Sequence, residues 1–198
     1  MQSAALFAAG TATAQQAAPD GRLFHAPLDT DYAADQAAGE ARPLFVENVE
    51  IVPDGAHGPA LRAADNQVLA WGAPGNLYAQ RGTVSFFWRA HQPIGERQFV
   101  IFRVGYPEHT SWDMTFLRLD WNGHGFDAFV TDANLARVRV SFDAPAPATD
   151  AWTHFAVAWD ETRGLTLYVD GKPAAKRETT AVLDNALFAF GPHSRILS

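Results

Sequence analysis

The stretch Asp150–Gly171, DAWTHFAVAWDETRGLTLYVDG, combines a histidine with neighbouring carboxylates, so it could take part in acid–base chemistry. Its candidates are His154 and the adjacent pair Asp160 and Glu161. Successive side chains of a β-strand point to opposite faces, so two adjacent carboxylates cannot converge on one substrate. The spacing therefore argues against a catalytic pair of carboxylates.

Apolar and polar residues alternate along the same stretch with a period of two, which is typical of strands. The residues that share its apolar face are Phe155, Val157, Trp159, Leu165, Leu167 and Val169. A five-residue link, DETRG, ends in glycine, so we predict a β-hairpin with Asp160 and Glu161 in solvent at its rim. Asp170-Gly171 begins the next tight turn. His154 lies on the other face, where we expect a structural, hydrogen-bonded role.

A second candidate site is the loop Gly105–Asp113, GYPEHTSWD, which follows an apolar run and is rich in turn-forming residues. Sugar rings stack on aromatic side chains, and their hydroxyls need polar partners nearby. The predicted ligand-binding residues are Tyr106, His109, Trp112 and Asp113. The alternative interpretation is that Trp112 folds back and fills the core.

An acidic segment near the N-terminus is the candidate for metal binding. Counted from Asp29, Asp31 and Glu40 occupy positions 3 and 12 of an EF-hand loop, but positions 5 and 6 are Ala33 and Ala34. An EF-hand needs a ligand and a glycine there, so this is not one. Asp29 and Asp31 remain candidate calcium ligands, and the alternative is a solvated acidic loop.

Length and composition restrict the class of protein. A chain of 198 residues with 47% apolar residues can form one domain with a substantial core. A net charge of −7 argues against a nucleic-acid binder, which needs a basic face for the phosphates. The absence of cysteine excludes disulfides and thiol nucleophiles, and neither a G-x-S-x-G nor an H-E-x-x-H motif is present.

Residues 1–21 are small, apolar and rich in alanine, and they contain ATA followed by glutamine. This pattern is similar to the end of a secretory signal peptide, and the alternative is a disordered leader. No later stretch approaches the roughly 20 consecutive apolar residues of a membrane span, so we predict no transmembrane segment. We expect a secreted, periplasmic or cell-surface protein.

From Leu44 onward, short β-forming runs recur and turn residues separate them, which predicts an all-β antiparallel sandwich or barrel. In GTVSFFWR, one face carries Val84, Phe86 and Trp88. In MTFLRLDW, one face carries Thr115, Leu117, Leu119 and Trp121, and the other carries Met114, Phe116, Arg118 and Asp120. These faces predict which side of each strand packs in the core.

The hairpin sequence WTHFAVAWD…GLTLYVDG resembles the corresponding hairpin of LamG-like jelly-roll domains, in the concanavalin A-like lectin/glucanase superfamily with laminin G modules and pentraxins. The upstream GTVSFFWR resembles another strand of that family, and the likeness covers roughly residues 22–191. It implies an antiparallel β-sandwich of the concanavalin A-like jelly-roll type. We therefore expect residues 22–198 to form a single LamG-like domain.

The resemblance also implies features outside the hairpin. Family members often bind one calcium ion at rim loops, which favours Asp29 and Asp31 as ligands. They normally close with a further strand, so we expect that this chain lacks its last strand or continues into a longer protein. Glycanases of the superfamily carry carboxylates at alternate positions of one strand, and no such set is found here; Glu47 and Glu50 are three residues apart. We therefore predict that the domain is not an enzyme.

The sequence predicts a recognition module that binds a carbohydrate or a protein surface. One alternative is a structural or assembly domain whose sheet edges pack against other domains or other copies of the chain. Another is an accessory part of a carbohydrate-active enzyme whose catalytic residues lie outside this chain. Fold alone does not decide between these functions.

Overall fold

The computed structural model describes residues 20–63, 68–105, 115–183 and 195–197, and every regular element in these ranges is a strand. The strands are β1 (Phe24–His25), β2 (Gln36–Ala37), β3 (Phe45–Glu47), β4 (Glu50–Val52), β5 (Ala60–Arg62), β6 (Val68–Gly72), β7 (Arg81–Trp88), β8 (Phe99–Gly105), β9 (Thr115–Trp121), β10 (Gly125–Thr131), β11 (Arg137–Asp143), β12 (Thr153–Asp160), β13 (Gly164–Val169), β14 (Lys172–Arg177) and β15 (Arg195–Leu197). The predicted all-β class is confirmed.

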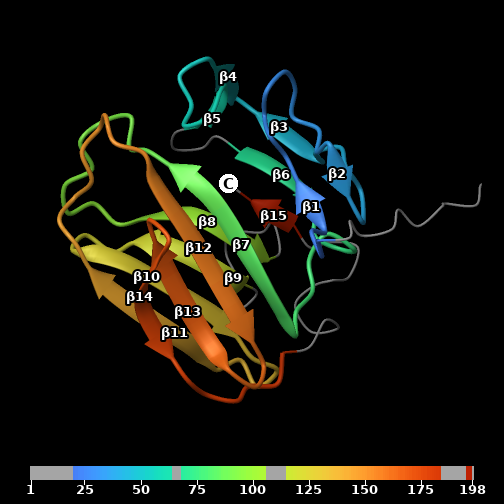
Figure 1. Cartoon of the computed structure of the whole chain (residues 1–198), viewed down its shortest axis with the longest axis vertical. Coiled ribbons are helices and arrows are strands. Elements are labelled where there is room, and N and C mark those ends of the chain that lie inside the picture. The colour runs from blue at the N-terminus through green and yellow to red at the C-terminus, as the bar shows by residue number, and fades with distance from the viewer. Residues whose placement is uncertain (1–19, 64–67, 106–114, 184–194, 198) are drawn as a thin grey trace, which may run out of the picture.

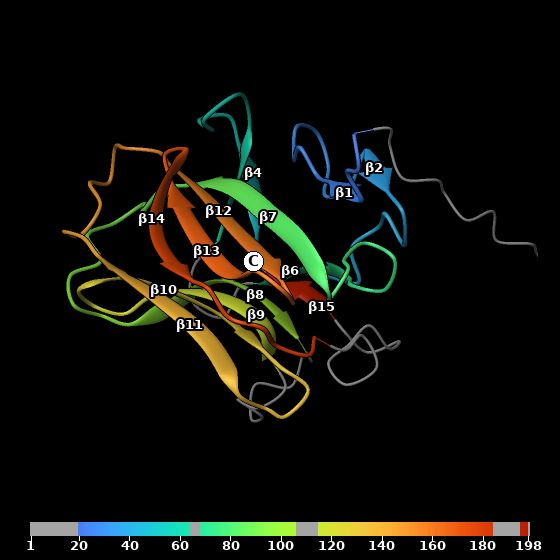
Figure 2. The same cartoon turned by 60° about the horizontal axis from the view of Figure 1, so that its bottom comes forward.

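Two antiparallel sheets form the sandwich, and Figure 2 shows them as two layers. One sheet has seven strands in the order β11-β10-β9-β8-β15-β6-β3, and the other has four in the order β14-β13-β12-β7. The short pairs β1-β2 and β4-β5 lie beside the sandwich near β3 and β6 (Figure 1). The strand β15 fills a central place between β8 and β6, which the sequence analysis did not assign to it.

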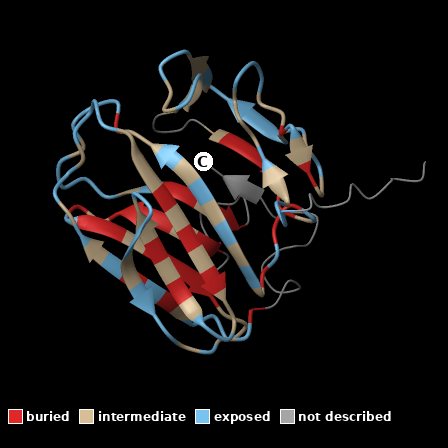
Figure 3. Ribbon diagram, viewed as in Figure 1, coloured by how far each residue is buried: buried red, intermediate tan, exposed pale blue. Residues whose placement is uncertain are grey.

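Buried residues lie along the strands of both sheets (Figure 3). The core between the sheets is dominated by aromatic and branched aliphatic side chains. Phe126 lies 4.7 Å from Phe155 and 5.2 Å from Trp121 between ring centroids, in tilted and edge-on arrangements that aromatic rings favour. Phe155, Val157, Leu165 and Leu167 are almost fully buried. These residues come from the apolar face that the alternation predicted.

The predicted hairpin is present as β12 and β13, with Phe155 opposite Val169 and Trp159 opposite Leu165. Asp170 and Gly171 both have positive φ, 50° and 74°, as the turn between β13 and β14 requires. This two-residue turn has the backbone twist that antiparallel strands prefer. Residues 150–171 are therefore part of the scaffold.

One strand departs from the predicted alternation. Phe116 was predicted on the face opposite Leu117, but it is fully buried in the core and its ring lies edge-on to Trp159, with centroids 5.9 Å apart. The register between β8 and β9 shifts between Val104 and Gly105, opposite this end of β9. A bulge at this point rotates the strand locally, so simple alternation fails there.

Trp71 fixes the N-terminal segment onto the sheet. Its side chain is buried on β6, its indole N–H donates to the carbonyl oxygen of Tyr32 at 3.1 Å, and Phe24 packs edge-on against it at 5.4 Å. A buried indole needs such a hydrogen-bond partner. Because of these contacts, β1 and its following loop stay beside β6 and help to form the cleft described next.

Candidate functional site

A large groove runs beside β7, the edge strand of the four-stranded sheet. Its volume is about 2140 Å³, and its lining comes from β7 and β8 together with β1, β5, β6 and the loop between β4 and β5. We call it the β7 groove. Concave sites are where small ligands bind most often, so the β7 groove is a candidate binding site.

An aromatic side chain is presented to solvent at this groove. Phe87, on the outward face of β7, is 42% exposed. His57, from the loop between β4 and β5, lies edge-on to its ring at 4.7 Å, and His154, from β12, lies against it at 4.8 Å. The Nε2 of His154 is 2.7 Å from the hydroxyl of Ser85, within hydrogen-bond distance. Phe87 is thus an apolar ring surrounded by polar groups.

Arg89 holds the loop between β4 and β5 next to this ring. Its guanidinium donates to both the carboxylate (2.8 Å) and the backbone carbonyl (3.2 Å) of Asp54. The same guanidinium stacks over the Trp152 ring at 4.7 Å, a cation–π contact. Arg89 therefore holds the loop that carries His57 through Asp54, and Trp152 in turn packs against the guanidinium of Arg89.

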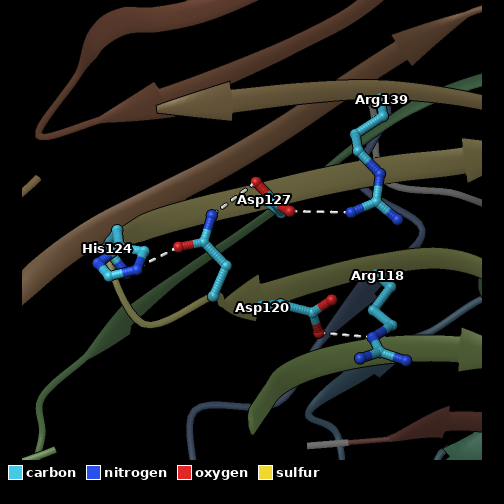
Figure 4. A network of polar contacts seen from close by, with 6 residues as sticks. Arg118, Asp120, His124, Asp127 and Arg139 are labelled. Carbon is cyan, nitrogen blue, oxygen red and sulfur yellow. Dashed lines mark hydrogen bonds and ion pairs between the residues drawn. The ribbon is translucent and has the colours of Figure 1, made fainter. Parts of the chain in front are cut away.

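A second polar cluster lies on the outer face of the seven-stranded sheet (Figure 4). Arg118 pairs with Asp120 at 2.5 Å within β9, and Arg139 of β11 pairs with Asp127 of β10 at 2.8 Å. The amide of Asn122 also donates to Asp127 at 2.9 Å. Sheet pairing places Asp120 directly opposite Asp127, an arrangement that their separation in sequence does not reveal.

Both carboxylates of this cluster are largely shielded from solvent, with about a tenth of each side chain exposed. Burial raises the pKa of Asp120, and the hydrogen bond and charge of Arg118 oppose that shift. Three guanidinium groups also surround the buried ring of Phe129, at 4.6 to 6.0 Å from its centroid. Since each carboxylate is engaged by an arginine, we interpret this cluster as structural.

The predicted ligand-binding residues Tyr106, His109, Trp112 and Asp113 lie outside the described residues. Their role stays a prediction.

Of the predicted calcium ligands, Asp31 accepts a hydrogen bond from the backbone N–H of Ala33 at 2.9 Å, and Asp29 is exposed. Among the described residues, no three acidic or histidine side chains come together to hold a metal ion. Asp29 and Asp31 would need further ligands to make a site, and calcium binding stays a prediction.

The cluster around Phe87 was not predicted from the sequence. A signal for its exposure was present, because Phe87 falls on the polar face of the alternation in GTVSFFWR. The contact with His57 had no such signal, since it joins residues 30 positions apart through the β4–β5 loop. His154 was expected to be a hydrogen-bonded structural residue, and its contact with Ser85 agrees with that expectation.

The two packed antiparallel sheets define a β-sandwich of the concanavalin A-like type. A family profile described as Concanavalin A-like lectin/glucanases superfamily, Laminin_G_3, matches residues 63–194. The chain therefore belongs to this family, as the hairpin predicted.

Solved structures share the fold at low sequence identity. The binding domain of Paraclostridial Mosquitocidal Protein 1 is 12% identical, with a TM-score of 0.58 over 83% of this chain and 44% of that one. The receptor binding domain of botulinum neurotoxin D is 12% identical, with a TM-score of 0.57 over 86% and 42%. The chain spans less than half the length of either structure. Curated proteins gave no match.

None of the described residues forms a helix long and apolar enough to cross a membrane.

Proposed function

We propose that this domain is a non-catalytic recognition module of an exported or cell-surface protein and that it binds a carbohydrate in the β7 groove. The observation that carries the proposal is the exposed ring of Phe87, which lines the groove together with His57 and Ser85. His154, on β12, contacts the same ring. A sugar presents an apolar face that can stack on this ring, and imidazoles and Ser85 supply partners for its hydroxyls.

The similar folds support a recognition role. One of the two solved structures named above is the binding domain of a mosquitocidal protein, and the other is the receptor binding domain of a neurotoxin. A protein partner is the second candidate ligand for the same groove, since β7 is an edge strand and could add an extended peptide. Glycan binding by Tyr106, His109, Trp112 and Asp113, and calcium binding by Asp29 and Asp31, remain separate proposals.

A glycan array tests the proposal, with the whole chain screened with and without added calcium. We expect binding to a defined set of glycans, and the two calcium conditions separate the metal prediction from the glycan prediction. Absence of binding in both conditions would contradict the carbohydrate proposal and favour assembly through sheet edges.

Substitution of Phe87 tests whether the glycan binds in the β7 groove. Phe87→Ala removes the stacking surface and should weaken glycan binding by about tenfold, the scale of one aromatic contact. Tyr168→Ala is the matched control, because Tyr168 is a half-exposed aromatic residue on β13 that does not line the groove. Equal losses in both variants, or none in Phe87→Ala, would place the site elsewhere.

A further inference from the structure

The two edges of the four-stranded sheet differ in the features that keep an edge unpaired. At one edge, β14 contains Lys172, Pro173, Lys176 and Arg177, and its pairing with β13 is interrupted by a bulge. Charged side chains, proline and bulges all discourage further pairing at a sheet edge. At the other edge, β7 is eight residues long, has no lysine or proline, and pairs with β12 without a shift in register. Only the β14 edge is protected in this way.

The backbone of β7 is open on the side of the groove. β7 pairs with β12 on its other side, and in the described part of the chain no second strand pairs with it. The edge strands of the seven-stranded sheet are charged or short, since β11 carries Arg137 and Arg139 and β3 has three residues. An unpaired row of N–H and C=O groups is a template for a further strand. β7 therefore offers eight residues of backbone to a partner strand.

The core-facing side chains of β7 are incompletely covered. Phe155 and Val157 of β12 are almost fully buried, whereas their partners across the sheet, Phe86 and Val84, are half-buried. Trp88 is also half-buried, and these three side chains of β7 line the groove. Removing apolar surface from water is favourable. A strand added beside β7 would therefore complete the core at this edge.

The β7 groove has room for one strand and is walled on both sides. Its volume is about 2140 Å³, and a strand of eight residues is roughly 27 Å long and lies about 4.8 Å from its neighbour. Residues 21–29 line the groove as well, and Figures 1 and 2 show β1 across from β7 with β6 between them. A second copy that paired through its own β7 would bring the rest of its sheet against this wall. A single strand has no such conflict.

We propose that the β7 groove binds an extended segment of a partner protein, which adds to the four-stranded sheet as a fifth strand. This inference rests on the protein partner proposed above as the second candidate ligand, and it specifies the chemistry of that partner. Glycan stacking on Phe87 does not depend on it. Phe87 lies on the outward face of β7, whereas the added strand uses the edge and the core-facing side.

The two faces of β7 define the sequence pattern of the partner segment. Residues beside Val84 and Phe86 enter the core and are apolar, and the residues between them lie beside Thr83 and Ser85 on the outward face and are polar. Arg81 is exposed at the start of β7 and favours an acidic residue beside it. A seated strand of this length buries on the order of 800 Å² of its own surface, each partner's share of a stable interface.

Synthetic peptides test this pattern. The probes have eight residues of alternating valine and threonine and one further glutamate, placed at the first or the last position. The control peptide has the same composition with its valines contiguous. Binding to the whole chain is measured by fluorescence anisotropy of the labelled peptide. We expect the better alternating peptide to bind about tenfold or more tightly than the control, and equal binding would overturn the inference.

Hydrogen exchange locates the bound peptide. Backbone amides of β7 should exchange about tenfold more slowly when the peptide is present, because those at the free edge gain hydrogen-bond partners. β14 is the matched control, since it is the other edge strand of the same sheet. Unchanged exchange in β7, or equal slowing in β14, would contradict strand addition at β7.

A charge reversal tests the end of the groove at Arg81. Arg81→Glu should weaken binding of the glutamate peptide by about three- to tenfold and should prefer a peptide with lysine in place of the glutamate. Arg177→Glu is the control, because it reverses the same charge at an exposed position on β14. Equal losses in the two variants, or no preference of Arg81→Glu for the lysine peptide, would overturn the placement beside Arg81.

The outcomes separate this inference from the glycan proposal. If glycans bind on the array and no alternating peptide binds, the inference is wrong and the glycan proposal stands. If the peptide binds and no glycan does, the glycan proposal fails and the inference stands. A chain that is dimeric by sedimentation velocity, with slow exchange in β7 before any peptide is added, would show that a second copy covers this edge and would overturn the inference.

Discussion

Gly82 on β7 and Trp159 on β12 are direct partners in the four-stranded sheet, and the indole of Trp159 occupies the space where a side chain at position 82 would be. A Cβ atom added at Gly82 would lie 2.6 Å from Cζ2 and 2.9 Å from Cη2 of Trp159. The indole is 3% exposed and donates from its N–H to the carbonyl oxygen of Ala79 at 2.9 Å. The glycine is therefore part of the packing of the hairpin.

Gly82→Ala should destabilise the fold by about 1–3 kcal/mol, because a buried, hydrogen-bonded ring must move to admit one methyl group. The measurement is the free energy of unfolding from urea titration. Gly72→Ala on β6 is the control, since its added Cβ would meet only ordinary contacts at 3.7 Å or more. Similar losses in the two variants would show that loss of glycine, and not the indole, causes the effect.

Trp159→Ala should cost about 3–5 kcal/mol, because a large buried ring is lost from the centre of the core. Trp159→Phe should cost less and should also relieve the contact with position 82. We therefore expect Gly82→Ala to be better tolerated in the Trp159→Phe background than in the parent chain. Strict additivity of the two substitutions in a double-mutant cycle would contradict the packing relationship.

The hairpin of β12 and β13 shows how much of the fold can be predicted from the sequence. Alternation in residues 153–169 predicted both the pairing of β12 with β13 and the face that is buried, since register is fixed wherever one face enters a core. Position 116 shows where this reasoning stops, because a bulge changes the alternation without a local sequence signal. The central place of β15 depends on long-range pairing with β6 and β8, which periodicity does not encode.

The candidate site was less predictable than the fold. The outward orientation of Phe87 followed from alternation, but its neighbours come from distant segments, with His57 on the β4–β5 loop and His154 on β12. The facing of Asp120 and Asp127 likewise depends on the register of β9 and β10. Local spacing reports which face a residue occupies, whereas the partners across a groove are set by tertiary packing.

Asp160→Asn should leave glycan binding nearly unchanged at neutral pH and should lower stability only slightly. The Oδ1 atom of Asp160 accepts hydrogen bonds from the Thr162 backbone (2.8 Å), the Thr162 hydroxyl (2.6 Å) and the Arg163 backbone (3.1 Å), and an amide oxygen can accept the same bonds. Asp160→Ala removes the acceptor and should be less stable in urea titration. A large loss of binding in a well-folded Asp160→Asn variant would mean that the hairpin rim has a function.

Stability at acidic pH should distinguish Asp160→Asn from the parent chain. Hydrogen bonds, first of all from the Thr162 hydroxyl, lower the pKa of Asp160 in the folded state. A lowered pKa stabilises the fold above the unfolded value of 3.8, and that contribution is lost as the pH falls through the folded pKa. As the pH falls through the folded-state pKa, the free energy of unfolding should therefore decrease less in Asp160→Asn than in the parent chain. Urea titrations at a series of acidic pH values measure this difference.

The contribution of Asp120 to stability should have the opposite dependence on pH from that of Asp160. Burial raises its pKa above 3.8, so the folded state binds a proton more tightly than the unfolded state does. Ionising this group therefore costs stability as the pH rises from the unfolded value through the folded pKa. The free energy of unfolding of the parent chain, relative to Asp120→Asn, should fall across this interval.

The control for Asp120 is Asp143→Asn, which changes an exposed carboxyl at the end of β11. Urea titrations from pH 3 to 7 give the difference between parent and variant at each pH. If the free energy of unfolding of the parent chain, relative to Asp120→Asn, rises with pH, the contact with Arg118 at 2.5 Å outweighs burial. The ionised pair then stabilises the sheet. A fall in this difference with rising pH identifies desolvation of the Asp120 carboxylate as the larger effect.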